Sequence, residues 1–287
     1  QVNVLKALEF ALTNGRSLVH PDYTLGLETG GLSNLDSYDK LVKTVYEQIR
    51  FIIDDSCRKV ALHTKESETN SHKPYKSLLT ESCIERGLDF NQHGALYDYY
   101  QVMLAGVPNL ADSLAVLRQF VYRDKTYTLE EVVDQLVRDF PDEKIRTEFV
   151  NKAPKYGNDI DEVDRIAVDI VNYCCDVLEE MSEKYGLRFH AQPFTFLWMI
   201  DYGRGTGASP DGRRSGEIVA YSVSPMQGRD FSGFVALLNS ISKLPTKRTP
   251  GTTSAIVEVD PKLFTDSNID CFTDILLAAA EKGLSNV

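Results

Sequence analysis

The sequence predicts a helix-rich α/β fold, and three observations lead to this prediction. Up to residue 185 the chain is mainly helical in pattern, because apolar residues recur at helical spacing in long segments. After Gly186, residues 187–203 and 254–260 are aromatic or alternate apolar with polar residues, as strands do. No repeat, linker or low-complexity tract divides the chain. Helices interleaved with isolated strands therefore indicate an α/β layer or barrel, and residues 1–287 are expected to form one domain.

The first segments each carry their own signal. Residues 2–15 place apolar side chains at helical spacing and end at Asn14-Gly15, a common C-terminal stop. A second helix is predicted from Ser37, which suits the N-cap position, to Cys57. Residues 65–77 are polar and rich in helix-breaking residues, so they are predicted to be a loop.

Helices are predicted along the rest of the chain as well. Thr128 and Glu131 have the spacing of a capping box. The longest amphipathic run is closed by Gly186, and the acidic residues at its start, 159–164, are expected to be solvated and to suit the helix dipole. A strand is expected to begin at Leu284. The predicted helices span residues 78–94, 109–124, 129–140, 161–185 and 233–244.

Composition excludes several classes of protein. The chain is 43% apolar and 25% charged, which is ordinary globular composition, and its net charge of -11 argues against a nucleic-acid partner. No apolar run approaches the roughly 20 residues that span a bilayer, and no signal-peptide pattern is present, so no membrane association and a cytoplasmic setting are expected. The cysteines lack the spacing of a disulfide scaffold or a zinc site. They are Cys57, Cys83, Cys174, Cys175 and Cys271.

Five segments, taken in order, carry a family resemblance. They are CIERGLDFNQHGALYD (83–98), NLADSLAVL (109–117), NKAPKYGNDIDEVD (151–164), GRGTGASPDGRRSGE (203–217) and SVSPMQGRDFSGFVALLNSISKL (222–244). The fourth is similar to a T-P-D-G-R loop, with Ser209 where Thr is usual, and the fifth to an S-P-x-x-G-x-D block. In this order they resemble the glycyl radical enzymes of the pyruvate formate-lyase superfamily, and the resemblance covers nearly the whole chain.

The resemblance implies part of a ten-stranded α/β barrel wrapped by helices. In this family a glycyl radical on one loop oxidises a cysteine on another loop to a thiyl radical, which abstracts hydrogen from a small organic substrate. Members act as lyases, dehydratases or decarboxylases. The radical is installed under anaerobic conditions by a partner activating enzyme that uses S-adenosylmethionine and an iron-sulfur cluster. The resemblance implies no tightly held organic cofactor for the lyase itself and a homodimer at full length, and no metal site is expected in this chain.

Two motifs of the family are not found in this sequence. The thiyl cysteine sits in a G-C-x-E loop before the helix that resembles residues 2–12, and the radical glycine sits in an R-V-S-G-F loop beyond the strand that begins near Leu284. The resemblance therefore implies a C-terminal portion that starts after the catalytic cysteine and ends before the radical glycine. We expect no catalysis from this chain alone and assign no catalytic residue within it.

Cys174 and Cys175 are adjacent, as a cysteine pair in pyruvate formate-lyase is, but their setting favours a structural role. Cys174 falls on an apolar helical stripe, where a thiol packs as a small hydrophobe. Asp176 and Glu179 nearby would raise a thiol pKa and so disfavour a reactive thiolate. Cys83 lies in a segment that resembles a family helix and is interpreted in the same way.

The strand-like segment after Arg188 supplies most candidates for substrate contact. In a strand, His190, Phe194, Phe196 and Trp198 would point to one face. In relatives the positions that resemble His190 and Phe194 face the substrate, which implies a pocket for an apolar or aromatic molecule with His190 as a polar contact. The alternative is that the aromatic residues pack against helices and His190 is a core histidine, because the face depends on register.

Two further features admit a structural interpretation beside the functional one. Met103 resembles a lumen position that a decarboxylase branch fills with glutamate, or it simply fills core space. The loop around Pro210-Asp211-Gly212 is a tight turn, its glycine spacing differs from a phosphate-binding loop, and Arg213 or Arg214 is expected to form structural salt bridges.

Two hypotheses of different class follow. In the first, the chain is a fragment of a glycyl radical enzyme that acts on a small organic, apolar or aromatic substrate and is inactive alone. In the second, it is a non-catalytic truncated relative or accessory subunit that uses the same scaffold. The five segments in order support the first, and the two missing motifs motivate the second.

Overall fold

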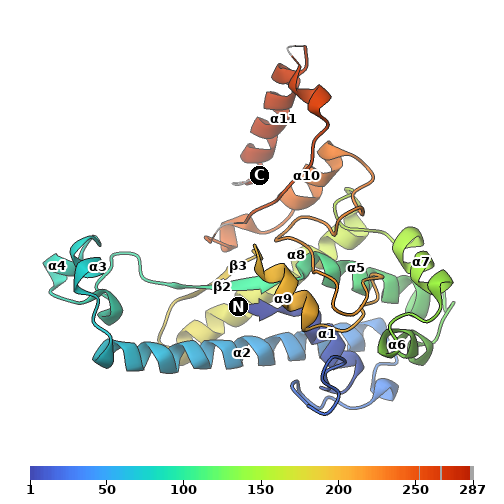
Figure 1. Ribbon diagram of the computed structural model, residues 1–287, viewed down its shortest axis with the longest axis horizontal. Coiled ribbons are helices and arrows are strands. Elements are labelled where there is room, and N and C mark those ends of the chain that lie inside the picture. Colours follow the sequence, from blue (N-terminus) through green and yellow to red (C-terminus); the bar gives the residue numbers. More distant parts are fainter. Residues whose placement is uncertain (252, 266, 285–287) are drawn as a thin grey trace.

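Three short parallel strands lie at the centre of the computed structural model, which describes residues 1–251, 253–265 and 267–284 (Figure 1). They are β1 (Val2–Asn3), β2 (Tyr100–Ala105) and β3 (Phe189–Gln192), in the order β1-β2-β3. Parallel neighbours need long crossovers, and here helices make them. The strands therefore come from three parts of the chain that are distant in sequence.

Four helices pack together beneath the sheet: α1 (Val4–Leu12), α2 (Tyr38–Asn70), α5 (Val107–Leu117) and α8 (Asp161–Tyr185). Helix α2 packs on α1 and α8, and α5 packs on α8. The side chain of Ser37 caps α2 as predicted, and α8 ends at Gly186 in the left-handed conformation. Their apolar faces join one hydrophobic core that also takes in the inner face of the sheet.

Shorter elements surround this centre. They are α3 (Pro74–Leu78), α4 (Cys83–Arg86), α6 (Leu129–Val137), α7 (Glu143–Lys152), α9 (Trp198–Arg204), α10 (Phe234–Ser242) and α11 (Ile269–Glu281), with a π-helical turn at Arg118–Arg123 and 3-10 turns at Leu32–Asn34, Phe90–Gln92, Thr246–Arg248 and Pro261–Phe264. The predicted capping box of Thr128 and Glu131 is present at the start of α6. Figure 1 shows α3 and α4 at the far end of α2, and α11 projecting past α10.

Two predictions about the region that follows Ser37 are wrong. Helix α2 continues to Asn70, so the predicted loop begins only at Ser71. The predicted helix at 78–94 is instead a set of short turns, because Ser82, Gly87 and His93 adopt left-handed backbone angles that interrupt a right-handed helix.

Two strand predictions also need correction. The strand expected within 187–203 ends at Gln192, because the next residue, Pro193, has no N–H to donate to a ladder. Among the described residues of 254–260 there is no paired strand, and Ile256 exchanges hydrogen bonds with the Ser224 hydroxyl instead. The strand expected from Leu284 lies outside the described residues from position 285 onward.

Candidate functional site

The two faces of the sheet differ in their surroundings. Val102 and Leu104 of β2, and Phe189 and Ala191 of β3, are buried and join the core formed with the helices. Side chains alternate between the faces of a strand, so the residues between these four point the other way. That second face, here called the open face, carries Gln101, Met103, His190 and Gln192.

The register of the strands brings these residues together in pairs. Gln101 is the partner of His190, and Met103 is the partner of Gln192. Tyr99, just before β2, packs edge-on to the His190 ring with 5.3 Å between ring centroids. The sequence left open which face His190 and Met103 occupy, and the structure places both on the open face.

The aromatic residues that follow β3 do not continue along the open face of the sheet. Phe194 and Phe196 stack with 6.3 Å between centroids, and Phe196 also meets the edge of Tyr221. Trp198 is the first residue of α9 rather than a strand residue, so the expectation that all these side chains share one strand face is wrong. Hydrogen bonds between Thr195 and Ser222 turn the chain away from the sheet.

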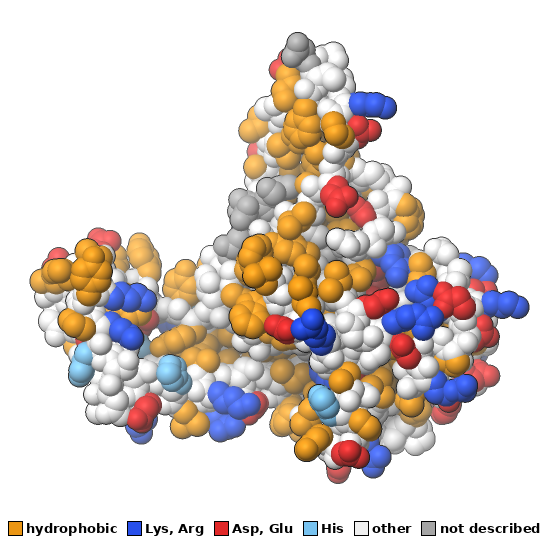
Figure 2. Space-filling model, in the orientation of Figure 1, with side chains coloured by type: hydrophobic (Ala, Val, Ile, Leu, Met, Phe, Trp, Pro, Cys, Tyr) orange, Lys and Arg blue, Asp and Glu red, His pale blue; other side chains and the backbone are white. Residues whose placement is uncertain are grey.

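A separate groove is lined by residues of the segments that follow β3. It has a volume of about 500 Å³ and is lined by Phe196, Met199, Tyr221, Met226 and Ile256, among others. Figure 2 shows hydrophobic side chains gathered on this part of the surface, around α9 and the segment that leads to α11. Of the predicted contact residues, Phe196 lines the groove, whereas His190 and Met103 lie on the sheet. The aromatic wall that the sequence predicts is thus divided between two surfaces.

One backbone segment covers part of the open face. A side chain at Gly251 would approach Gln192 Cγ to 3.0 Å and Gln101 Nε2 to 3.2 Å, so the chain passes close over both residues. Gln192 is buried, and within the described part of the chain its Oε1 has no hydrogen-bond partner. The amide oxygen of Gln192 is therefore a buried polar group on this face that accepts no hydrogen bond from the described residues.

The turn at Pro210-Asp211-Gly212 is buried and built around a carboxylate. Asp211 accepts hydrogen bonds from Asn109 Nδ2 at 2.8 Å and from Ser209 Oγ at 2.6 Å, and the residue is buried. Gly212 has φ 94°, a left-handed angle that glycine adopts without strain. Ser209, at the position where the T-P-D-G-R loop that this segment resembles has Thr, supplies a hydroxyl that donates to this carboxylate.

Arg213 is buried in the same loop and binds backbone oxygens rather than an acidic side chain. Its guanidinium donates to the carbonyls of Glu217 at 2.7 Å and Thr206 at 3.2 Å, and also to that of Gly207. The prediction named Arg213 or Arg214 as a salt-bridge residue, and Arg213 makes no such pair among the described residues. It is confirmed for Arg214, whose Nη2 lies 2.6 Å from Glu143 Oε2.

The N–H groups of this loop are already used within the protein. Those of Gly207, Asp211 and Gly212 donate to Glu9, to the Ser113 hydroxyl and to the Ser209 carbonyl. A phosphate-binding loop needs free N–H groups that converge on an anion. The loop is thus a structural brace, in agreement with the interpretation of its sequence.

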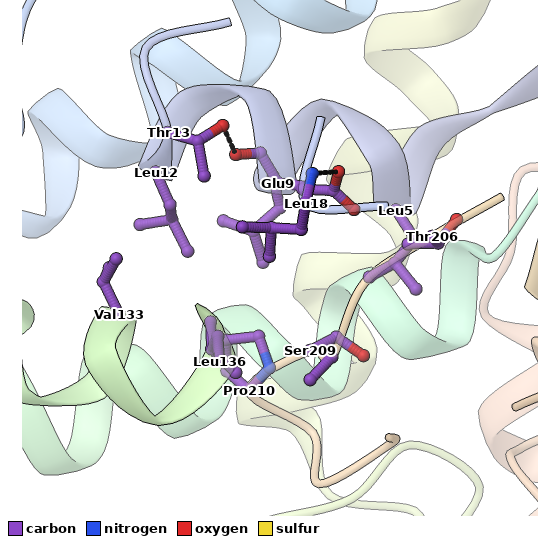
Figure 3. A pocket seen from close by; sticks show the side chains of 12 residues that line it. Leu5, Glu9, Leu12, Thr13, Leu18, Val133, Leu136, Thr206, Ser209 and Pro210 are labelled. Carbon is purple, nitrogen blue, oxygen red and sulfur yellow. Dashed lines mark hydrogen bonds between the residues drawn. The ribbon is translucent and has the colours of Figure 1, made fainter. Parts of the chain in front are cut away.

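A buried ion pair joins α1 to this loop. Lys6 Nζ lies 2.5 Å from Glu9 Oε1 and also donates to the Gly205 carbonyl at 2.8 Å, while Glu9 accepts from the N–H groups of Leu18 and Gly207. Burial lowers the pKa of Lys6, and the neighbouring Glu9 opposes this effect. Figure 3 shows Glu9 above Ser209 and Pro210, beside a cavity of only about 10 Å³. The loop is therefore packed tightly on α1.

The cysteine pair has the structural role that its spacing predicts. Cys174 and Cys175 are buried in α8. Burial raises the pKa of Cys174 well above its ordinary value and that of Cys175 to about 11, although Arg248 opposes the second shift. Neither thiol would ionise at neutral pH. Cys83 is also buried, although its helix has a single turn.

The acidic start of α8 is only partly solvated. Asp161 is exposed, as predicted, but the Asp164 side chain is fully buried and lies 2.8 Å from Lys243 Nζ. Over the described ranges, no group of three or more His, Cys, Asp or Glu residues could hold a metal ion. The helices of the same ranges are all too short or too polar to cross a membrane.

Sequence reasoning missed several residues of this region. Strand β2 was not assigned, so the pairing of Gln101 with His190 could not be foreseen. Lys6 and Glu9, three residues apart in an otherwise apolar helix, were a visible signal of a buried ion pair. Asn109 gave no such signal, because its role depends on Asp211, 102 positions away.

Comparisons with known proteins agree with this geometry. A family model described as pyruvate formate lyase-like matches residues 1–203. The chain is 29% identical over 252 residues to a trans-4-hydroxy-L-proline dehydratase of Clostridioides difficile, covering 88% of this chain and 32% of that protein.

Two solved structures superpose on nearly the whole chain. They are a B12-independent glycerol dehydratase from Clostridium butyricum (TM-score 0.89, 26% identity, 98% of this chain and 36% of that one) and a glycyl radical enzyme from Archaeoglobus fulgidus (TM-score 0.90, 26% identity, 99% and 36%). The chain spans about a third of the length of the relatives it matches.

The fold is thus that of part of a glycyl radical enzyme barrel, as the sequence predicts. The chain belongs to the pyruvate formate-lyase superfamily.

Proposed function

We propose that this chain forms one part of a glycyl radical enzyme, a radical dehydratase, lyase or decarboxylase, and that its open face contributes to the wall of the substrate site. The single observation that carries the proposal is the register of β2 and β3, which places His190 and Met103 on the sheet face away from the helices. Relatives of the chain are dehydratases, lyases and a decarboxylase, which supports this range of activities.

The residues of the open face favour a small organic substrate with few charges. Gln101, His190 and Gln192 offer hydrogen bonds, and Met103 adds an apolar, adaptable contact. The groove lined by Phe196 and its neighbours adds further apolar contacts. A substrate with an apolar or aromatic body and one hydroxyl or carboxylate group fits these side chains. His190 would donate a hydrogen bond to that group.

The 287-residue chain is proposed to be inactive on its own. The resemblance assigns the thiyl cysteine and the radical glycine to motifs that no residue of this chain matches, and Cys174 and Cys175 are poor substitutes because both are buried in the core of the helices and do not lie on the open face. The radical chemistry would then be supplied by other parts of the enzyme. Our proposal includes a radical S-adenosylmethionine activating partner, a homodimer at full length, and an anaerobic cytoplasmic setting.

Electron paramagnetic resonance tests the proposal directly. The gene that contains this chain is expressed with its reading frame extended in both directions, and the purified protein is activated anaerobically with a radical S-adenosylmethionine activating enzyme. We expect a glycyl radical doublet, followed by consumption of a small organic substrate in a screen. A correctly folded, full-length protein that gives no doublet would instead support the non-catalytic accessory hypothesis.

A further inference from the structure

Residues 72–99 form a small lobe, here called the arm, at the far end of α2 (Figure 1). It contains α3, α4 and the turn at Phe90–Gln92. The arm carries large apolar side chains that are between 51% and 80% exposed, namely Tyr75, Leu78, Leu79, Ile84, Leu96 and Tyr97. The contacts that hold the arm on α2 therefore determine the position of this exposed apolar surface.

His93 contacts two carboxylates, Glu68 of α2 and Asp98 of the arm itself, and the first of these contacts links the arm to α2. Its Nε2 lies 3.0 Å from Oε1 of Glu68, in the last turn of α2, and its Nδ1 contacts Oδ2 of Asp98, just before β2. The other hydrogen bonds from the arm to α2 and its C-cap, within the described residues, run from the amides of Gln92 and Asn91 to the carbonyls of Glu68 and Ser71. Those amides do not titrate, so among these hydrogen bonds the contact of His93 is the one that depends on pH near neutrality.

The geometry has a simple chemical requirement. A neutral imidazole has one N–H and one lone pair, so it can donate to only one of two carboxylates. An imidazolium donates from both nitrogens and satisfies Glu68 and Asp98 together. Partial burial lowers the pKa of His93, the hydrogen bonds and charges of Asp98 and Glu68 raise it, and the net shift is upward.

Other charged groups surround His93 but do not replace this contact. Arg86 of α4 donates to the His93 carbonyl at 2.9 Å, so it faces the backbone. Arg58 and Lys65 of α2 and Tyr185 of α8 line a groove of about 440 Å³ next to the ring. His93 also has φ 61°, an angle that residues other than glycine seldom adopt, so the surrounding contacts hold it in place.

We propose that His93 is a pH-dependent clamp, which holds the arm on α2 while the imidazole carries its second proton and loosens the arm when that proton is lost. The sign follows from linkage. A histidine whose folded-state pKa is raised contributes stability that is fully present below its ordinary pKa of about 6.5 and is lost as the pH rises through the raised value. The clamp is independent of the radical chemistry proposed above.

Hydrogen exchange of the intact protein, read by mass spectrometry at pH 6 and pH 9 with labelling times corrected for the intrinsic rate, tests the clamp. We expect peptides from 72–99 to lose protection at the higher pH, about tenfold for each unit by which the folded pKa of His93 exceeds the ordinary value. Peptides from α5 and α8 serve as the internal reference and should change little.

Three variants complete the test. His93→Gln should show low arm protection at both pH values, whereas His72→Gln, a matched change on the exposed arm surface, should behave like the wild type. Glu68→Gln removes one acceptor charge and should move the midpoint of the transition to lower pH. Arm protection that is independent of pH in the wild type, or a pH response that survives in His93→Gln, would overturn the proposal. If His93→Gln also lowers the hydrogen-exchange protection of α5 and α8, that variant is destabilised as a whole. The proposal is then tested by the shift of the pH midpoint in Glu68→Gln, and an unchanged midpoint would overturn it.

Discussion

Gln101 on β2 and His190 on β3 are register partners in a parallel sheet, and both side chains leave it on the face that the helices do not cover. Their neighbours on the other face, Val102 and Phe189, are buried among the helices. The same short strands thus have a structural face and a face available for chemistry. This division allows the two roles to be separated by mutation.

Replacing His190 by alanine in the full-length, activated enzyme should impair catalysis and leave stability nearly unchanged. The imidazole is on the open face, so its loss removes a proposed hydrogen bond to substrate, which is worth roughly 1–3 kcal/mol for a polar substrate group. We expect kcat/KM to fall by about 5- to 150-fold, because about 1.36 kcal/mol corresponds to a factor of ten, measured by steady-state kinetics beside a thermal melt.

Phe189→Ala is the matched control, because the same strand places Phe189 on the helix-packed face. It should destabilise the protein by about 3 kcal/mol or more, as a large-to-small core change does, without a selective effect on KM. A large drop in melting temperature for His190→Ala would show instead that this histidine is a core residue.

Arg213→Lys should destabilise the protein although it keeps the positive charge. The guanidinium of Arg213 donates to several carbonyls at once, and an ammonium cannot reproduce that planar arrangement. Unpaired buried groups cost about 1–3 kcal/mol each, so we expect a loss of roughly 3 kcal/mol, seen in chemical denaturation.

Arg214→Lys is the control for this change, since its contacts with Glu143 lie at the surface. Surface ion pairs are worth at most about 1 kcal/mol, and the effect should be correspondingly small. Equal effects of the two substitutions would contradict the buried brace that we assign to Arg213.

Thiol labelling should distinguish the cysteines by burial. Cys271 is exposed, whereas Cys174 is buried in α8 and its thiol pKa is raised by that burial. The thiolate is the reactive form, so iodoacetamide at pH 8 should modify Cys271 in the native protein and Cys174 only after denaturation. Peptide mass spectrometry shows the order in which the two cysteines are modified. Rapid native modification of Cys174 would show a reactive site in place of a packing residue.

Much of the helical framework was predictable because its signals are local. Ser37 and Thr128 cap helices by contacts with residues three positions away, and Gly186 ends α8 through its own backbone angle. Amphipathic spacing likewise identified Cys174 as a core residue. The errors occurred where a local pattern competed with a backbone constraint, as at Pro193, which ends β3, and at Ser82 and His93, whose left-handed angles break the predicted helix.

Residue order and spacing within a few helical turns were enough to predict the family, the main helices and the packing role of the cysteine pair. The three-dimensional fold was needed to show which face His190 and Met103 occupy, since that depends on the register between strands nearly ninety positions apart. It also decided that Asp211 and Arg213 are buried brace residues, because their partners come from α5 and from backbone oxygens that no local pattern reveals. The pairing of segments that are distant in the sequence therefore creates the open face, to which we assign a chemical role.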